Sequence, residues 1–334
     1  MEISRNRIVM LVGLLVFVSA VVVYFTVDLD TLRRLSDFHP ASLVGVGLLI
    51  ASGMYFDALR LQRLSTVTGR RVGLSDALRV VFGNYFMALL TPGASGGAVI
   101  QVLFLKKAGI PTGRATVVVL IRTVLSILFL IVCLPVVFYF DPQILPWFDR
   151  NAIVRGSVLL LGVVAAGMVT LRTGLSDRLA VIVLKRLPVR WRLRLMKVYR
   201  DMRGAMALMA ASPTTVGMAF VESGISLLLL YAMVPMLFAG IGAEFDWLQV
   251  MGRMIFLNLL LYFAPTPGGA GVAEGLFITG FKSILPLGTV GVAAVAWRIF
   301  AEYLPACIGG YFTVKVFGIR RLSGKKSDKN GALK

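Results

Sequence analysis

The sequence predicts an all-α polytopic membrane protein with about six full transmembrane helices and two re-entrant hairpins, broken by proline and glycine, in an inverted repeat. Three observations support this fold class. The 334-residue chain is 58% hydrophobic and 15% charged, its apolar residues fall in long runs, and one Thr-Pro-Gly motif occurs twice. A soluble domain of this length would need more polar surface to cover its core. Residues 1–320 are therefore predicted to form a single transmembrane domain.

Six segments are predicted to cross the bilayer, because each supplies most of the roughly 20 apolar residues that a crossing requires. The first lies between Arg7 and Asp28. We expect it to be retained, since its apolar stretch is too long for a signal peptide and no clear cleavage site follows. The last segment is expected to bend near Pro305. In chain order the segments are about 8–27, 41–59, 115–140, 153–171, 213–240 and 287–314.

The formal net charge of +19 would by itself fit nucleic-acid binding. Its distribution argues against nucleic acid, because most of the 35 Lys and Arg alternate with the predicted crossings, whereas the opposite loops carry Asp and Glu. This positive-inside bias predicts a multi-pass protein of the cytoplasmic (inner) cell membrane, with both termini cytoplasmic and membrane lipids as its neighbours. The basic segments are 1–7, 58–79, 106–114, 172–203 and 315–334.

Residues 74–110 and 247–285 do not fit a simple series of crossings. In each, two short apolar pieces flank a run of proline and glycine. Each stretch is either a hairpin that enters and leaves on one side, or two full crossings, and both alternatives add an even number of crossings. We favour hairpins, because residues 98–105 are too few to span the bilayer and Asp76 and Arg79 shorten the preceding arm.

The most basic connector of the chain is predicted at residues 172–210. Within it, apolar residues such as Trp191, Leu195 and Val198 recur every three or four positions, and the basic residues lie mostly elsewhere on the helical wheel. This pattern indicates an amphipathic helix in the inner-leaflet interface. A basic cytoplasmic connector that only fixes topology fits equally well. The tail, residues 321–334, is basic and polar and is expected to be disordered.

The two irregular stretches resemble each other. Thr-Pro-Gly occurs at Thr91 and again at Thr266, and in both copies an asparagine precedes the motif and an arginine follows it at nearly the same spacing. Three predicted crossings separate the copies, so they must point in opposite directions. The inverted repeats are expected at about 41–140 and 213–314, and such repeats place transporter binding sites where the copies meet.

The glycines of both motifs are candidates for anion binding. A helix that restarts after Gly96 and Gly97 at Ala98, or after the second glycine run at Val272, presents free N–H groups and the positive end of its dipole. The alternative is a tight turn that lets helices pack closely. The second motif contributes Pro267, Gly268 and Gly269 to this candidate set.

Charged residues inside the predicted crossings are more specific candidates, because each costs at least roughly 2.5–3.5 kcal/mol to insert. We expect Arg122 and Arg298 to bind a lipid phosphate through paired hydrogen bonds. Glu274 and Glu302 would balance them in the empty protein or carry a coupling proton. The alternative is that Arg298 pairs with these acids and only locks helices together. Polar residues that could add hydrogen bonds, or serve only as helix–helix contacts, are Asn84, Ser95, Gln101 and Asn258.

Signatures of catalysis are missing from the sequence. A single histidine, His39, and the absence of a Cys/His/carboxylate cluster argue against a metal site, and no Walker A loop is present. We therefore expect no cofactor, no metal and no enzymatic activity.

At the two motifs the sequence resembles the transmembrane-region family of lysylphosphatidylglycerol synthase, a family of flippase-like membrane proteins. The matching stretches run from Thr91 through Gln101 to Ile110, and from Pro265 to Glu274. The resemblance implies translocation of a phosphate-bearing lipid, such as a phospholipid, an aminoacyl-phospholipid or a polyprenyl-phosphate lipid, without the soluble synthase domain.

Two other functions stay open from the sequence. The chain could be an accessory subunit that binds a partner membrane enzyme of a lipid or glycolipid pathway, with residues 172–203 as the docking face. It could also be a membrane enzyme that acts on a lipid headgroup through Glu274 or Glu302. The oligomeric state is not predicted.

Overall fold

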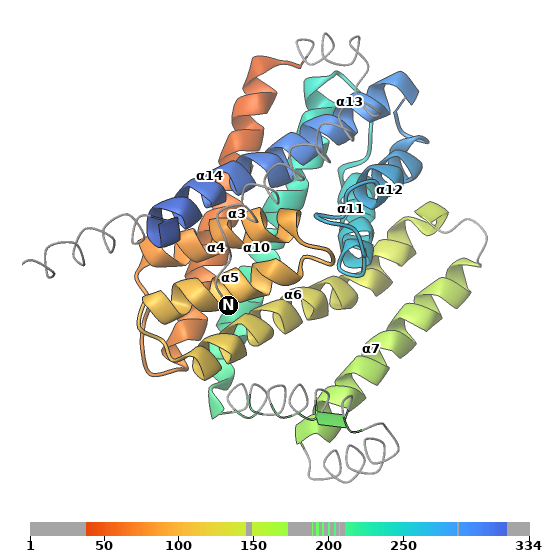
Figure 1. Ribbon diagram of the computed structural model, residues 1–334. Helices are drawn as coiled ribbons and strands as arrows, with labels where there is room; N and C mark the ends of the chain where they lie inside the picture. Colours follow the sequence, from red (N-terminus) through yellow and green to blue (C-terminus); the bar gives the residue numbers. More distant parts are fainter. Residues whose placement is uncertain are drawn as a thin grey trace, which may run out of the picture.

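The computed structural model describes residues 38–144, 149–172, 212–285 and 287–318, with isolated positions between 189 and 211. Throughout these residues the regular elements are helices (Figure 1). The predicted crossing at 8–27, nearly all of the connector at 172–210 and the tail at 321–334 lie outside the described residues. Helices long and apolar enough to cross a membrane are Pro40–Thr66, Thr112–Phe140, Pro213–Gly240 and Thr289–Phe317, which confirms an all-α membrane protein.

The long helices begin and end within a few residues of the predicted crossings, with one exception. The crossing predicted at about 41–59 lies in a helix that continues to Thr66. It continues because Asp57 and Arg60, one turn apart, form an ion pair inside the protein, so these charges do not end the segment. The long helices are α3 (Pro40–Thr66), α6 (Thr112–Phe140), α7 (Arg150–Arg172) and α10 (Pro213–Gly240).

The first irregular stretch forms two short helices, α4 (Leu74–Leu90) and α5 (Ser95–Lys107). The turn between them uses left-handed backbone at Gly93 and Ala94. The second helix begins at Ser95 rather than at the predicted Ala98. With 13 residues it is about 20 Å long, short of the roughly 30 Å of hydrocarbon in a bilayer.

The second irregular stretch has the same plan. Helices α11 (Trp247–Leu261) and α12 (Val272–Phe281) flank the proline–glycine loop, in which Gly268 and Gly269 have positive φ. The helix restarts at Val272, as the sequence predicts. Its 10 residues cover about 15 Å, half the thickness of the hydrocarbon core.

The last predicted crossing is interrupted where the sequence places a bend. Helix α13 (Leu287–Arg298) passes into a π-helical turn, η3 (Ile299–Tyr303), before α14 (Leu304–Thr313). Pro305 lacks an N–H and cannot donate the usual hydrogen bond to the preceding turn, which accounts for the widened helix. A second π turn, η4 (Val314–Gly318), follows α14.

The two predicted repeats have the same order of elements and reciprocal packing. Each contains a long helix, two short helices and a further long helix. The two leading helices, α3 and α10, pack on each other, while α14 packs on α4 and α6 packs on α11 (Figure 1). The last helix of each repeat thus packs on the first short helix of the other repeat. Helix α7 packs on α6, outside this arrangement.

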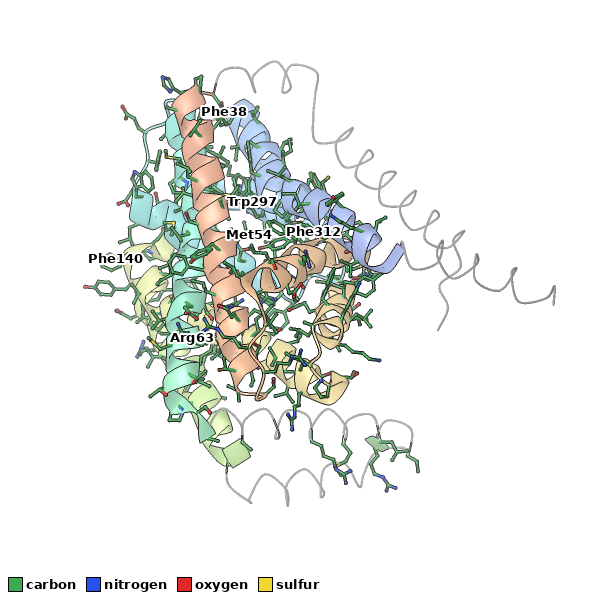
Figure 2. All side chains as sticks on the ribbon, turned by 90° about the vertical axis from the view of Figure 1, so that its left-hand side faces the viewer. Phe38, Met54, Arg63, Phe140, Trp297 and Phe312 are labelled. Atoms are coloured by element: carbon green, nitrogen blue, oxygen red, sulfur yellow. The ribbon has the colours of Figure 1, made fainter. Side chains whose placement is uncertain are left out.

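An aromatic cluster fixes the second short hairpin in place. Phe277 of α12 stacks on Trp297 of α13, with ring centroids 5.0 Å apart. Phe281 of α12 meets Phe238 of α10 edge to face at 5.2 Å. These contacts pack α12 between α10 and α13. In Figure 2, Phe38 lies just before the start of α3 and Arg63 lies near its other end.

Candidate functional site

Arg122 of α6 is buried and fully engaged by two other helices. Its Nε donates to Asp57 Oδ1 of α3 at 3.1 Å, and its Nη2 pairs with Asp57 Oδ2. Its Nη1 donates to Gln101 Oε1 of α5 at 2.7 Å. The sequence offered no acid within a turn of Arg122, but the fold supplies one from α3. Only 8% of the residue is exposed.

Arg60 shares the same carboxylate. Its Nη2 pairs with Asp57 Oδ1, and its Nη1 donates to Ser126 Oγ at 2.7 Å and Ser223 Oγ at 2.9 Å. Arg60, assigned from the sequence to the basic segment after the crossing, is buried within α3, where Asp57 and two hydroxyls bind it. We call Asp57, Arg60 and Arg122 the paired-arginine cluster. Two guanidinium groups on one carboxylate give it a net charge of +1.

Gln101 links this cluster to the first proline–glycine motif. Its Nε2 donates to Asn84 Oδ1 of α4 at 2.8 Å. A Cβ added at Gly97 would lie 2.4 Å from that same Asn84 Oδ1, so the glycine is needed for α4 and α5 to approach. Three of the predicted site residues, Asn84, Gly97 and Gln101, are thereby brought together with Arg122.

Arg298 is at the centre of a second cluster. Its Nε lies 2.9 Å from Glu274 Oε1 of α12, and its Nη1 pairs with Glu302 of the π turn. Its Nη1 also donates to the carbonyl of Gly268 at 3.0 Å. Glu274 Oε2 accepts the N–H of Gly271 at 2.7 Å. We call Glu274, Arg298 and Glu302 the acidic cluster, because two carboxylates on one guanidinium give it a net charge of −1.

The two proline–glycine loops meet directly. Pro92 and Pro267 form an isolated antiparallel bridge, and the N–H of Gly268 donates to the carbonyl of Ala88 at 3.3 Å. Gly268 has φ +57°, and a Cβ there would lie 2.5 Å from Leu89 Cδ1 and 3.2 Å from its Cα, so glycine favours this close approach. The candidate motifs, distant in the chain, therefore share one contact.

The N–H groups at the two helix starts already have partners in the protein. The Gly96 N–H donates to Thr91 Oγ1 at 2.8 Å, and the Gly271 N–H donates to Glu274. Ser95 Oγ donates to the carbonyl of Pro92 at 3.0 Å and lies on the exposed turn. Gly269 adopts positive φ with Leu261 close by. These features support the tight-turn interpretation of the motifs rather than anion binding by the helix starts.

Asn258 is not brought to either cluster. Its Nδ2 donates to the carbonyl of Met254 one turn earlier in α11, at 2.8 Å. The hydrogen bond of Asn258 thus lies within its own helix, whereas that of Asn84 joins Gln101 of the neighbouring helix.

Two further ion pairs, one buried and one partly exposed, were missed by the sequence analysis as sites. Arg253 of α11 donates from Nε to Asp141 Oδ2 at 2.7 Å and from Nη1 to Ser283 Oγ at 2.7 Å. Arg63, one turn beyond Arg60, donates from Nε to Glu222 Oε1 of α10 at 2.8 Å. A signal for the first was present, since Arg253 interrupts an apolar run and must find a partner there.

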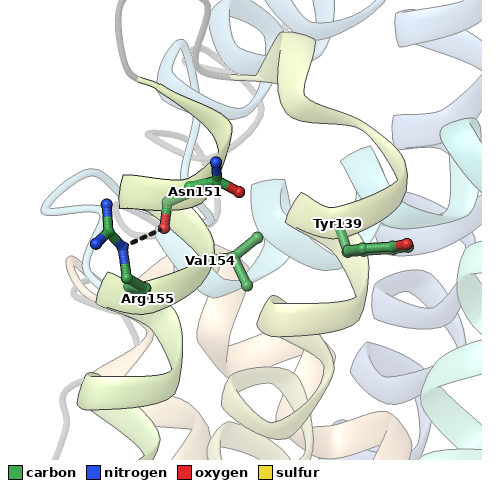
Figure 3. A pocket seen from close by; sticks show the side chains of 4 residues that line it. All are labelled: Tyr139, Asn151, Val154 and Arg155. Atoms are coloured by element: carbon green, nitrogen blue, oxygen red, sulfur yellow. Dashed lines mark hydrogen bonds between the residues drawn. The ribbon is translucent and has the colours of Figure 1, made fainter.

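A cavity of ≈ 680 Å³ lies away from both clusters, between the end of α6 and the start of α7. It is lined by Tyr139, Asn151, Val154 and Arg155 (Figure 3). Arg155 Nε donates to the carbonyl of Asn151 at 3.1 Å. None of the predicted site residues lines it. Among the described residues no group of three or more His, Cys, Asp or Glu could hold a metal ion.

Comparison with protein families places these features in a known context. The family model for the lysylphosphatidylglycerol synthase TM region matches residues 10–309. The chain belongs to this family. Membership in the lysylphosphatidylglycerol synthase TM region family relates the chain to membrane lipid handling and confirms a multi-pass membrane protein. A comparison with curated proteins gives no significant match.

Proposed function

We propose that this chain is a flippase that moves an anionic, phosphate-bearing lipid between the leaflets of the cytoplasmic membrane. The observation that supports this most strongly is the paired-arginine cluster, in which two buried guanidinium groups share one carboxylate. A net positive charge held in an apolar environment is costly unless an anion neutralises it.

The cluster has the chemistry to bind a phosphate. A guanidinium group binds phosphate oxygens with two parallel hydrogen bonds, as it binds a carboxylate. A lipid phosphate can therefore replace Asp57 as the partner of Arg122, while Asp57 stays paired with Arg60. Arg60 Nε is buried and has no hydrogen-bond partner among the described residues, which leaves a further donor for the lipid.

The architecture favours a carrier over a static scaffold. We interpret α4–α5 and α11–α12 as re-entrant hairpins of two inverted repeats, because each pair is short and each repeat packs reciprocally on the other. The antiparallel contact of Pro92 with Pro267 fits hairpins that enter from opposite sides. The alternation of basic segments supports cytoplasmic termini, which places the chain in the inner membrane.

Movement is part of the proposal, because both clusters are closed. Arg122 is 8% exposed and Arg298 is 2% exposed, so a lipid headgroup reaches them only if the hairpins separate. Membrane lipids are the partners, and no catalytic step is assigned to the chain. A partner membrane enzyme would supply or consume the lipid.

Reconstitution in liposomes tests this function. We expect purified protein to accelerate the exchange of labelled lipids between leaflets. The acceleration should be larger for lipids with a phosphate-bearing anionic headgroup than for neutral lipids. Arg122→Gln should lose at least about tenfold of this acceleration, since a charge-assisted hydrogen-bond pair contributes about 1.5–3 kcal/mol per bond. Arg79→Gln is the control, because Arg79 makes an ion pair with Asp76 at the surface. Equal rates for neutral and anionic lipids, or an unimpaired Arg122→Gln variant, would reject the proposal.

The accessory-subunit alternative makes a different prediction for the same variants. If the chain only recruits an enzyme, Arg122→Gln leaves the lipid product of the pathway unchanged and the partner co-purifies with it. If the chain were itself a headgroup enzyme, lipid mass spectrometry would show a product that disappears in Glu274→Gln.

A further inference from the structure

The acidic cluster has an unbalanced negative charge inside the protein. Glu274 and Glu302 share Arg298, so one carboxylate lacks a full counter-charge. Glu302 lies in the π-helical turn η3, and π turns within helices occur frequently at functional sites. Burial of an unpaired carboxylate is costly, and a bound proton removes that cost.

The two clusters are connected through the proline–glycine loops. Arg122 donates to Gln101, and Gln101 donates to Asn84 of α4. One turn later on α4, the carbonyl of Ala88 accepts the N–H of Gly268. The carbonyl of Gly268 in turn accepts a hydrogen bond from Arg298. A continuous series of contacts therefore joins the positive cluster to the negative one.

We propose that the acidic cluster is a proton site coupled to the anion site, such that the protein takes up one proton for each lipid anion it binds. The inference rests on the proposed function. The empty protein carries +1 at one cluster and −1 at the other. A lipid monoanion neutralises the first, and a proton from water that adds to a carboxylate oxygen of Glu302 neutralises the second. The loaded carrier then has the same net charge as the empty one.

Glu302 is the acceptor rather than Glu274. The side chain of Glu302 is 22% exposed, whereas that of Glu274 is 7% exposed. Glu274 also accepts the N–H of Gly271, a bond that favours its ionised form. A proton from water therefore reaches Glu302 more readily and displaces fewer hydrogen bonds there.

The charged and titratable groups around Glu302 come from several helices. Arg298 of α13 attracts its carboxylate and Glu274 of α12 repels it. Tyr303 lies beside it in the π turn, with its ring 5.6 Å from the Arg298 guanidinium. Tyr85 of α4 interacts electrostatically with Glu302 of the acidic cluster and with Asp57 of the paired-arginine cluster.

The coupling between the lipid anion and the proton is positive. Because the anion and the proton stabilise each other on the protein, each increases the affinity for the other by the same factor. Raising the pH therefore weakens binding of the lipid anion, by up to about tenfold per pH unit for one linked proton.

Calorimetry on the purified full chain in neutral detergent tests the coupling. The probe is short-chain phosphatidylglycerol, whose phosphodiester does not titrate near neutral pH. Heats measured in buffers of different ionisation enthalpy, from about pH 6 to pH 8, give the number of protons taken up per bound lipid. We expect a maximum near one for the wild type and near zero for Glu302→Gln, with Glu302→Gln affinity independent of pH. Glu244→Gln, which removes an exposed loop carboxylate, should behave as the wild type.

The outcomes separate the coupling from the proposed function. If the wild type binds the probe without proton uptake at any pH, or if Glu302→Gln retains the uptake, the coupling is wrong while lipid binding stands. If the wild type does not bind the probe, or Arg122→Gln binds it equally well, the proposed function itself fails. The pH dependence of wild-type affinity decides the matter even if Glu302→Gln does not fold.

Discussion

Replacing Asp57 with Asn removes the carboxylate that holds Arg60 and Arg122 together, with almost no change in side-chain size. The empty protein is then left with two buried guanidinium groups and no counter-charge between them. Loss of one partner of a buried ion pair costs about 3–5 kcal/mol. At about 2–4 °C per kcal/mol, the apparent Tm of Asp57→Asn should fall by roughly 6–20 °C.

Asp76→Asn is a matched control for this change. Asp76 and Arg79 are also an aspartate and an arginine three residues apart on a helix, with N and O atoms 2.7 Å apart. Their side chains are 44% and 40% exposed, whereas those of Asp57 and Arg60 are 5% and 4% exposed. A surface pair of this kind contributes no more than about 1 kcal/mol. The two variants therefore differ in the burial of the carboxylate and in the number of arginines that it binds, two for Asp57 and one for Asp76.

Thermal unfolding in neutral detergent, followed by tryptophan fluorescence, measures both variants with and without short-chain phosphatidylglycerol. A phosphate that replaces the missing carboxylate should recover more stability in Asp57→Asn than it adds to the wild type. The reasoning is refuted if Asp57→Asn and Asp76→Asn lose the same stability, or if the anionic lipid stabilises Asp57→Asn no more than the wild type.

Two further predictions concern the hairpins. Gly97→Ala should cost about 1–3 kcal/mol in thermal unfolding, because its Cβ would overlap Asn84 Oδ1, whereas Gly113→Ala meets open space and should cost far less. A disulfide between cysteines placed at Pro92 and Pro267, in a chain without other cysteines, should block lipid translocation until it is reduced, since a β-bridge brings the two Cα atoms within disulfide range. Unchanged translocation by the cross-linked protein would show that these loops need not separate.

The sequence was sufficient to predict where the described helices lie, but not which charged residues pair between them. The length of the apolar runs located α6 and α10, and the proline–glycine motifs located the two short hairpins. Asp57 and Arg60 were missed as site residues, because Arg60 was assigned to the basic segment that follows the crossing and Asp57 has no charged neighbour in the motifs. Two opposite charges one turn apart on a helix neutralise each other, so α3 can bury both side chains.

The composition of the clusters depends on contacts distant in the chain. Arg122 and Arg298 follow the two motifs at nearly the same spacing, but only Arg298 has an acid within one turn, Glu302. In the fold, Arg122 shares the single carboxylate of Asp57 in α3 with Arg60. Arg298 instead pairs with two carboxylates, one from α12 and one from η3. The i,i+4 spacing of Arg298 and Glu302 predicts the second pairing, but no spacing rule predicts the first, because α3 lies before the motif and its pairing with α6 is set by helix packing.

The pairing of both arginines with acids does not in itself argue against a carrier. An unpaired arginine in the empty protein would cost at least roughly 2.5–3.5 kcal/mol, so a carrier must hold a counter-ion when no lipid is bound. What distinguishes the sites is the ratio of charges. Arg253 and Asp141 are matched one to one, as expected of a pair that only ties α11 to the end of α6. The paired-arginine cluster has an excess cation and the acidic cluster an excess anion, and an excess charge at a buried site favours a bound ion or proton that restores neutrality.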